Sequence, residues 1–317
     1  MTIPIALLIV AIAFVTLSKS ADLIVKAVTH LAHIFHVSEF SIGFFILGLA
    51  TSTPEIFVGL NSALDGHPEL SLGNLIGATI VLLTLIIGLS AIIGREIHFI
   101  QSFSAKDMWL TSFMIFAPAL FVFDGFLSRL DGLALIILYC VFYLVMNKDQ
   151  TFSEHIQNTL THHHNHLAKT FLFMVIGIIG LFFSSKFLIE STKFLAVTFN
   201  LPLILLGLLI VSLGTNLPEF VILFKSIRNS HKQIGMGDFL GSAVTNTPIL
   251  GMVSLLHPIS LGEPLKVYLS IGMLLVTLIT FNAFFSIDRK LTRVEGFALV
   301  SLYLFFVLSE VFLKNRI

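Results

Sequence analysis

Long apolar runs recur along the whole chain, and short polar segments separate them. A helix that crosses a bilayer needs about 20 consecutive, mostly apolar residues, and ten runs approach or exceed that length. They cover residues 3–18, 38–64, 70–94, 108–125, 129–147, 170–192, 201–227, 235–258, 264–286 and 294–313. The pattern therefore predicts an all-α integral membrane protein with ten transmembrane helices.

Two of these runs are interrupted by the same kind of motif, LATSTPE at 49–55 and LGTNLPE at 213–219. Proline has no N–H, so Pro54 and Pro218 each leave a carbonyl about one turn earlier without its helical partner, near Ala50 and Gly214. A free carbonyl beside a carboxylate offers hard oxygen ligands, which suit Na⁺ or Ca²⁺. An ionisable residue at membrane depth marks a functional site by default.

The similarity extends beyond the motif. A shift of 164 positions aligns residues 43–77 with 207–241 without a gap, and 10 of the 35 pairs are identical. The identical pairs are Gly43/Gly207, Ile46/Ile210, Leu49/Leu213, Thr51/Thr215, Pro54/Pro218, Glu55/Glu219, Ser62/Ser226, His67/His231, Gly73/Gly237 and Gly77/Gly241. Shared apolar composition does not readily explain glycine, proline and glutamate in register, so we infer an internal duplication.

The duplication predicts three regions. Residues 1–147 form a first five-helix repeat around the motif region 43–82, and residues 170–317 form a second around 207–246. Because each half has an odd number of spans, the halves enter the membrane in opposite directions. Between them, 148–169 is a His-rich polar linker, which we interpret as solvated; a regulatory metal site is the alternative.

Charge distribution predicts the orientation of the chain. With the N-terminus outside, the inner loops carry 12 Lys and Arg residues and the outer loops carry 6. This bias favours a multi-pass protein of the plasma (cell inner) membrane with both termini outside. The net charge of zero indicates no nucleic-acid partner.

The paired motifs resemble the two α-repeats of the calcium/cation antiporter superfamily, the sodium/calcium exchanger type. Its repeats read approximately G-T-S-x-P-E, followed further along by G-N-x-x-G-S-N. Here ATSTPE at 50–55 precedes GNLIGAT at 73–79, and GTNLPE at 214–219 precedes GDFLGSA at 237–243. The resemblance implies that Glu55 and Glu219 face each other as central cation ligands. It implies further oxygen ligands from Thr51, Ser52, Thr215, Asn216, Ser242 and Asn246.

The chain departs from the family pattern in its first repeat. The family's further side-chain ligands follow each glutamate by 27 positions, where this chain has Leu82 and Asn246. Asn246 can still ligate through its amide oxygen, although capping a broken helix is an alternative role. Leu82 cannot ligate. Asp238 aligns with Asn74 near the start of its predicted span. We interpret it as a residue that satisfies free N–H groups at a helix start, and ion contact is the alternative role.

We therefore expect a secondary antiporter and not an enzyme, because the sequence contains no catalytic triad, phosphate-binding loop or complete zinc motif. It would exchange Ca²⁺ or a related cation against Na⁺ or H⁺ by alternating access, and by resemblance the first and sixth spans would slide. No cofactor is expected beyond the transported ions. The expected partners are those cations and the lipid bilayer, with no obligatory protein partner. Alternatives are a cation channel of the same build, a transport-dead scaffold or sensor, and, for the two glutamates, protonated structural residues.

Overall fold

A computed structural model describes residues 2–34, 42–99, 103–146, 164–228, 232–261 and 264–314. The first half contains α1 (Ile3–Ile34), η1 (Ile42–Leu47), α3 (Gly48–Thr51), α4 (Thr53–Leu64), α5 (Pro68–Ile80), η2 (Val81–Ile86), α6 (Ile87–Gly94), β1 (Glu96–His98), α7 (Ala105–Phe121), β2 (Phe126–Leu127) and α8 (Arg129–Met146). The second contains α10 (His164–Phe199), α11 (Leu203–Leu206), η3 (Gly207–Val211), α12 (Ser212–Thr215), α13 (Leu217–Arg228), α14 (Lys232–Leu256), β3 (Ile259–Ser260), α15 (Pro264–Asp288), β4 (Lys290–Thr292) and α16 (Arg293–Lys314).

The predicted all-helical membrane architecture is confirmed in its coarse form. Within the described residues, eight helices are long and apolar enough to cross a membrane. The bent pair Gly43–Thr51 and Thr53–Leu64 raises this number to nine if it forms one span. Helix α7 has 17 residues, about 26 Å of helix against a hydrocarbon core of about 30 Å. The count of ten spans stays a prediction.

One predicted segment limit is wrong. The first apolar helix was expected to end at residue 18, but α1 continues to Ile34, so Lys19 lies inside a helix and not in a loop. The limits of the polar linker, 148–169, stay a prediction, and its residues from His164 onward are helical and belong to α10. The rest of the linker and its other histidines, at 155, 162 and 163, lie outside the described residues.

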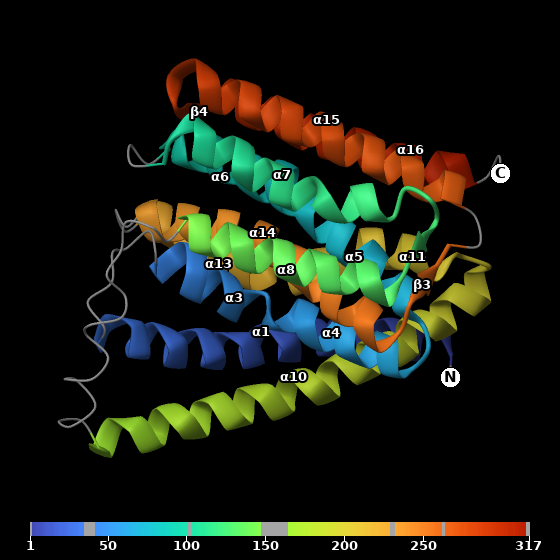
Figure 1. The fold of residues 1–317 in the computed structure, drawn as a ribbon. Coiled ribbons are helices and arrows are strands. Elements are labelled where there is room, and N and C mark those ends of the chain that lie inside the picture. Colours follow the sequence, from blue (N-terminus) through green and yellow to red (C-terminus); the bar gives the residue numbers. More distant parts are fainter. Residues whose placement is uncertain are drawn as a thin grey trace.

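The helices run roughly along a common direction (Figure 1). Helices α1 and α10 pack along each other on one side of the bundle, and α14 lies near its middle, in contact with η1, α4, α5, α7, α8 and α13. Helix α16 packs on η2 and α6 at the opposite side. The long pair α1–α10 is thus a separate layer beside the part of the molecule that carries both motifs.

Short strand pairs join the two halves at opposite ends of the bundle (Figure 1). Strand β1 pairs with β4, with Ile97 opposite Leu291, and β2 pairs with β3, with Leu127 opposite Ile259. The 164-residue shift that aligns the motifs brings β1 onto β3 and β2 onto β4. Equivalent segments of the two halves therefore lie at opposite ends of the molecule.

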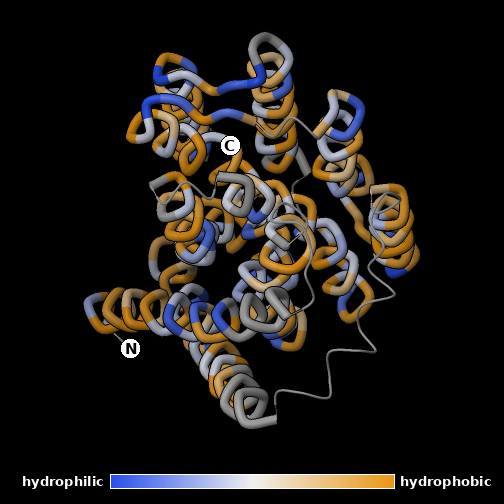
Figure 2. Tube along the Cα trace, turned by 90° about the vertical axis from the view of Figure 1, so that its left-hand side faces the viewer, coloured by the Kyte–Doolittle hydropathy of each residue, from blue (hydrophilic) through white to orange (hydrophobic). Residues whose placement is uncertain are grey.

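The distribution of hydropathy fits a bilayer environment. Figure 2 shows apolar residues around most of the helices, with many hydrophilic residues where the chain reverses. Large apolar side chains such as Phe113, Leu130 and Phe312 are exposed on the helices. In a bilayer these faces meet lipid instead of water, so their exposure carries no penalty.

Candidate cation site

Each motif breaks its span in the same place. In the first repeat the chain passes from the π-helical turn η1 through α3 and bends by 44° before α4. In the second, the π-helical turn η3 leads into α12 and then α13. In both repeats the glutamate stands in the first turn after the break, since Glu55 is in the first turn of α4 and Glu219 in that of α13. π-Helical turns are rare in proteins, and those that occur are frequently found at functional sites.

Glu55 and Glu219 are the central pair of the site. Each is 1% exposed, and within the described part of the chain none of their four carboxylate oxygens has a hydrogen-bond partner. The two carboxylates lie close enough for their charges to interact. None of the ion pairs among the described residues includes either of them. An unpaired carboxylate costs several kcal/mol to bury, so the arrangement calls for a cation or protons.

Two threonines connect the repeats to each other. The Thr51 hydroxyl lies 2.9 Å from Asp238 Oδ1, to which it donates. The Thr215 hydroxyl donates to Asn74 Oδ1 at 3.2 Å. The two bonds are equivalent in the duplication, because the 164-residue shift relates Thr51 to Thr215 and Asn74 to Asp238. Each threonine also lies near the glutamate of the opposite motif, Thr51 near Glu219 and Thr215 near Glu55.

Ser52 and Asn216 occupy the breaks themselves. Ser52 Oγ donates to the Gly48 carbonyl at 2.8 Å, and Asn216 Nδ2 donates to the Ser212 carbonyl at 2.6 Å. Both donors are thereby used within their own helix turn. The Asn216 Oδ1 atom is buried without a hydrogen-bond partner in the described chain. Oxygen lone pairs at both breaks remain able to face a cation.

Ser242 and Asn246 reach the first repeat from α14. Ser242 Oγ lies 2.8 Å from Thr51 Oγ1 and donates to the Gly48 carbonyl at 3.3 Å. Asn246 Nδ2 donates to the Thr79 hydroxyl at 3.1 Å. The capping alternative for Asn246 is wrong, because α14 continues without a break from Lys232 to Leu256.

The sequence suggests that the carbonyl freed by Pro54 has no hydrogen-bond partner, but in the structure it has one. Thr53 Oγ1 donates to the Ala50 carbonyl at 2.6 Å. This carbonyl keeps a second lone pair, so it can still ligate a cation. In the second repeat the equivalent of Thr53 is Leu217, which has no hydroxyl to reach the Gly214 carbonyl.

Glycines allow the motif helices to cross at backbone contact. A Cβ atom at Gly77 would overlap the Leu208 carbonyl oxygen, and one at Gly241 would overlap the Phe44 carbonyl oxygen. The 164-residue shift relates these two contacts as well. They hold α5 against η3 and α14 against η1, which brings the two breaks and their glutamates together.

The helix-start role that the sequence predicted for Asp238 is wrong. It lies more than one turn inside α14, whose first residue is Lys232, so it is not a helix-start residue. It is fully buried, and its hydrogen bond goes to Thr51 in the other repeat. The available signal was its alignment with Asn74, a second polar residue at membrane depth. Leu82, by contrast, is 1% exposed and packed in the apolar core.

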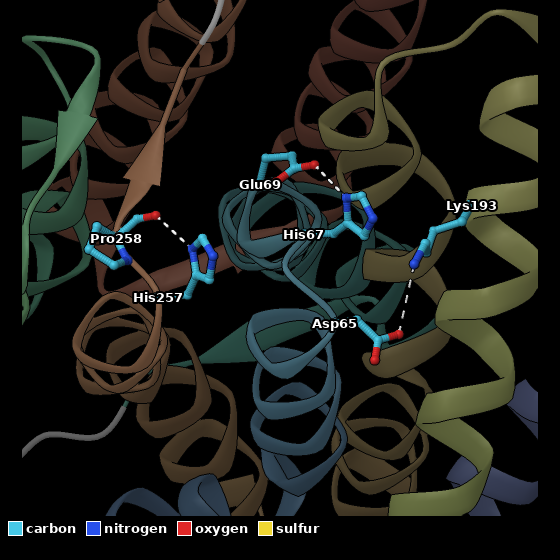
Figure 3. A network of polar contacts seen from close by, with 6 residues as sticks. All are labelled: Asp65, His67, Glu69, Lys193, His257 and Pro258. Carbon is cyan, nitrogen blue, oxygen red and sulfur yellow. Dashed lines mark hydrogen bonds and ion pairs between the residues drawn. The ribbon is translucent and has the colours of Figure 1, made fainter.

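Polar residues at one end of the bundle surround the turn between α4 and α5 (Figure 3). Lys193 Nζ lies 4.0 Å from Asp65 Oδ2, and His67 Nδ1 lies 3.2 Å from Glu69 Oε1. Nearby, His257 Nδ1 lies 3.0 Å from the Pro258 carbonyl. Among the described residues no three His, Cys, Asp or Glu side chains already form a metal-binding group.

A bundle of membrane-spanning helices that buries two unpartnered carboxylates among hydroxyl and amide oxygens is the construction of a cation transporter. The sequence profile of the family "Sodium/calcium exchanger protein" matches residues 5–147 and 169–312. The chain belongs to this family, and the resemblance noted in the sequence is confirmed.

Individual relatives agree with this assignment. The chain is 28% identical over 263 residues to inner membrane protein YrbG of Escherichia coli, covering 80% of each protein. It is 25% identical to the sodium/calcium exchanger MaX1 of Methanosarcina acetivorans, covering 95% of this chain and 97% of the relative. A structure of the sodium-calcium exchanger NCX_Mj, soaked with Na⁺ and Sr²⁺, superimposes with a TM-score of 0.70 at 23% identity, covering 97% of this chain and 99% of that one. The protein is thus a multi-pass membrane protein that carries out cation antiport.

Proposed function

We propose that this chain exchanges Ca²⁺, or a related cation, against Na⁺ or H⁺ by alternating access at the Glu55–Glu219 pair. The observation that carries the proposal is the state of these two carboxylates. They are buried, close to each other, contributed by equivalent positions of two repeats, and without hydrogen-bond partners in the described chain.

The charge of the pair supports exchange. Two ionised carboxylates carry −2, which one Ca²⁺ or two Na⁺ ions balance. A second set of ions cannot enter while the first set occupies the same oxygens. Protons compete in another way, because protonating either glutamate removes the charge that holds a metal ion. Binding of the two substrates is therefore mutually exclusive, which is the requirement for antiport.

The surrounding ligands favour hard cations. Hydroxyl oxygens come from Thr51, Ser52, Thr215 and Ser242, and amide oxygens come from Asn216 and Asn246. Ca²⁺ takes six to eight oxygen ligands at 2.3–2.6 Å. Thiolate and imidazole ligands, which softer metals prefer, are absent from this set.

The proposed architecture is ten spans in two inverted five-helix repeats, with both termini outside and the linker inside. Two features of the fold support it. Strands that the duplication equates lie at opposite ends of the bundle, and α1 begins at the same end at which α16 finishes (Figure 1). Helix α8 ends and α10 begins at the other end (Figure 1). An inverted repeat with an odd number of spans in each half requires this arrangement.

The proposed moving elements are α1 and α10. They pack mainly on each other, while the motif helices cross at the glycine contacts and have no space to slide. The Phe14 ring of α1 fills the space next to Gly214, at the second motif. A displacement of α1 would therefore open that motif without disturbing the crossing of the repeats.

The test is flux into proteoliposomes that contain the purified protein, with Ca²⁺, Na⁺ and pH gradients varied separately. Ca²⁺ uptake that requires an opposing Na⁺ or H⁺ gradient supports exchange and identifies the counter-ion. Ca²⁺ flux that persists without any counter-ion would establish a channel instead. Absence of both flux and ion-dependent thermal stabilisation would establish a scaffold or sensor.

A further inference from the structure

The buried carboxylate of Asp238 stands outside the Glu55–Glu219 pair and has no assigned role. It is fully buried, and its Oδ2 atom has no hydrogen-bond partner in the described part of the chain. Its Oδ1 atom accepts a hydrogen bond from Thr51 at 2.9 Å. Thr51 also lies near Glu219, so through this hydrogen bond Asp238 borders the central site.

The duplication provides an internal comparison for this residue. Asn74, its equivalent, accepts the same hydrogen bond from Thr215 through a neutral amide oxygen. A neutral residue thus suffices for the structural task of joining the two repeats. Burying an ionised carboxylate at position 238 instead is unfavourable unless a cation or a proton offsets the charge, and none of the ion pairs among the described residues includes Asp238. An ionisable side chain at this position is therefore more than the fold requires.

The atoms around Asp238 are suited to a hard cation. Ser242 follows Asp238 by one helical turn, about 6 Å along α14, and its hydroxyl meets Thr51 at 2.8 Å. The Thr51 hydroxyl has a second acceptor, the Leu47 carbonyl at 2.9 Å. It can therefore turn its hydrogen to Leu47 and present its oxygen to a cation beside Asp238, without leaving a donor unsatisfied.

We propose that Asp238, with the hydroxyl oxygens of Thr51 and Ser242, binds a monovalent hard cation such as Na⁺ next to the Glu55–Glu219 pair. One carboxylate supplies a single negative charge, which suits a monovalent ion better than a divalent one. The equivalent positions of the duplication cannot form a second such subsite, because Asn74 lacks the charge and Ala78 stands at the position equivalent to Ser242. This inference assigns a substrate to one carboxylate of the proposed exchanger, and thus rests on the proposed function.

The substitution Asp238→Asn tests it, because asparagine keeps the Thr51 hydrogen bond and reproduces the other repeat. The control is Glu310→Gln, which neutralises a buried carboxylate on α16 that is bonded to Ser270 and lies outside the candidate site. Na⁺ binding is measured by thermal stabilisation of the purified protein across a Na⁺ titration. We expect Asp238→Asn to need about tenfold more Na⁺ for half-maximal stabilisation, because asparagine offers the cation a neutral oxygen in place of a charged one. Glu310→Gln should follow the wild type, and superimposed titrations of Asp238→Asn and wild type would overturn the assignment.

A measurement on the unmodified protein covers the case in which Asp238→Asn does not fold. A hydrophobic carbodiimide modifies buried carboxyl groups, and mass spectrometry quantifies the modification at each residue. Na⁺ should protect Asp238, whereas modification of Asp238 that is independent of Na⁺ would contradict the inference. Flux measurements separate the two proposals. Exchange without Na⁺ protection of Asp238 contradicts only this inference, and protection without exchange contradicts only the proposed function.

Discussion

Asn246 Nδ2 donates to Thr79 Oγ1 at 3.1 Å, and this bond ties the middle of α14 to α5 of the other repeat. The residue equivalent to Asn246 is Leu82, which has no polar atom to offer. The two repeats therefore differ at this position, where the resemblance to the family implies a further side-chain ligand in each. Of the two residues, only Asn246 has a side-chain oxygen.

Replacing Leu82 with asparagine should tighten Ca²⁺ and shift its pH dependence toward lower pH. The substitution restores an oxygen for an ion that takes six to eight, and a more polar wall favours charged carboxylates over protonated ones. Ca²⁺-dependent flux is titrated at several pH values, with Leu82→Met as a control that preserves volume without adding a hard oxygen. If the Leu82→Asn and wild-type titrations superimpose, Leu82 does not face the ions.

Neutralising either central carboxylate should abolish exchange. Glu55→Gln and Glu219→Gln keep the size of the side chain and one oxygen, but each leaves a single charge, which cannot balance Ca²⁺. The variants should still fold, because the wild-type carboxylate oxygens make no hydrogen bonds in the described chain that would be lost. Flux and gel-filtration profiles are measured together. Wild-type exchange rates in both single variants would remove these residues from the site.

Adding a methyl group at either glycine crossing should destabilise the protein. Gly77→Ala and Gly241→Ala direct a Cβ at the Leu208 and Phe44 carbonyl oxygens, so backbone has to move, at about 1–3 kcal/mol each. Gly272→Ala is the matched control, because nothing lies within 4 Å of its added Cβ. Thermal unfolding in detergent compares all three. Equal stability of Gly77→Ala and Gly272→Ala would mean that the repeats do not cross here.

Cysteines introduced at His67 and His163 should label from opposite sides of the membrane. His67→Cys lies in the turn between α4 and α5, and His163→Cys lies in the linker, which is outside the described residues. Both are made in a Cys140→Ala background, since Cys140 is exposed on α8. A membrane-impermeant thiol reagent is applied to intact cells and to inverted vesicles. Labelling of both cysteines from the same side would refute the inversion.

Loosening the contact between α10 and α4 should change the exchange rate with little loss of stability. Asn61 Nδ2 donates to Ser185 Oγ at 2.7 Å, and Ser185→Ala removes that acceptor. Loss of about 1 kcal/mol corresponds to a roughly fivefold change in the balance between access states. Ser184→Ala is the control, because among the described residues Ser184 bonds only within its own helix. Equal maximal rates for both variants would show that this contact does not hold α10.

Much of the site was predictable because it breaks the rules for an apolar helix. Proline, glutamate and paired glycines inside long apolar runs are conspicuous in the sequence, and their repetition fixes the alignment of the two halves. Asp238 was misassigned because its span was expected to begin at residue 235, which placed it in the first turn. The true start at Lys232 moves Asp238 inward and frees it from capping.

Other features had no local signal. Lys19 interrupts the first apolar run, so the continuation of α1 to Ile34 could not be anticipated from hydropathy. The π-helical turns η1 and η3 have ordinary apolar sequences, IGFFIL and GLLIV. The hydrogen bonds from Thr51 to Asp238 and from Thr215 to Asn74 join residues more than 140 positions apart. Such contacts depend on how the halves assemble, which local patterns do not encode.

In the inverted architecture proposed above, an aspartate at 238 opposite an asparagine at 74 would make the two faces of the protein chemically distinguishable. A symmetric duplicated carrier would perform alike whichever way round it was inserted. Here a vesicle preparation with random insertion should contain two kinetic populations, one whose ions pass the charged residue first and one whose ions pass the amide first. Uptake by such vesicles should follow a double exponential, and uniformly oriented vesicles should yield one of its two rates.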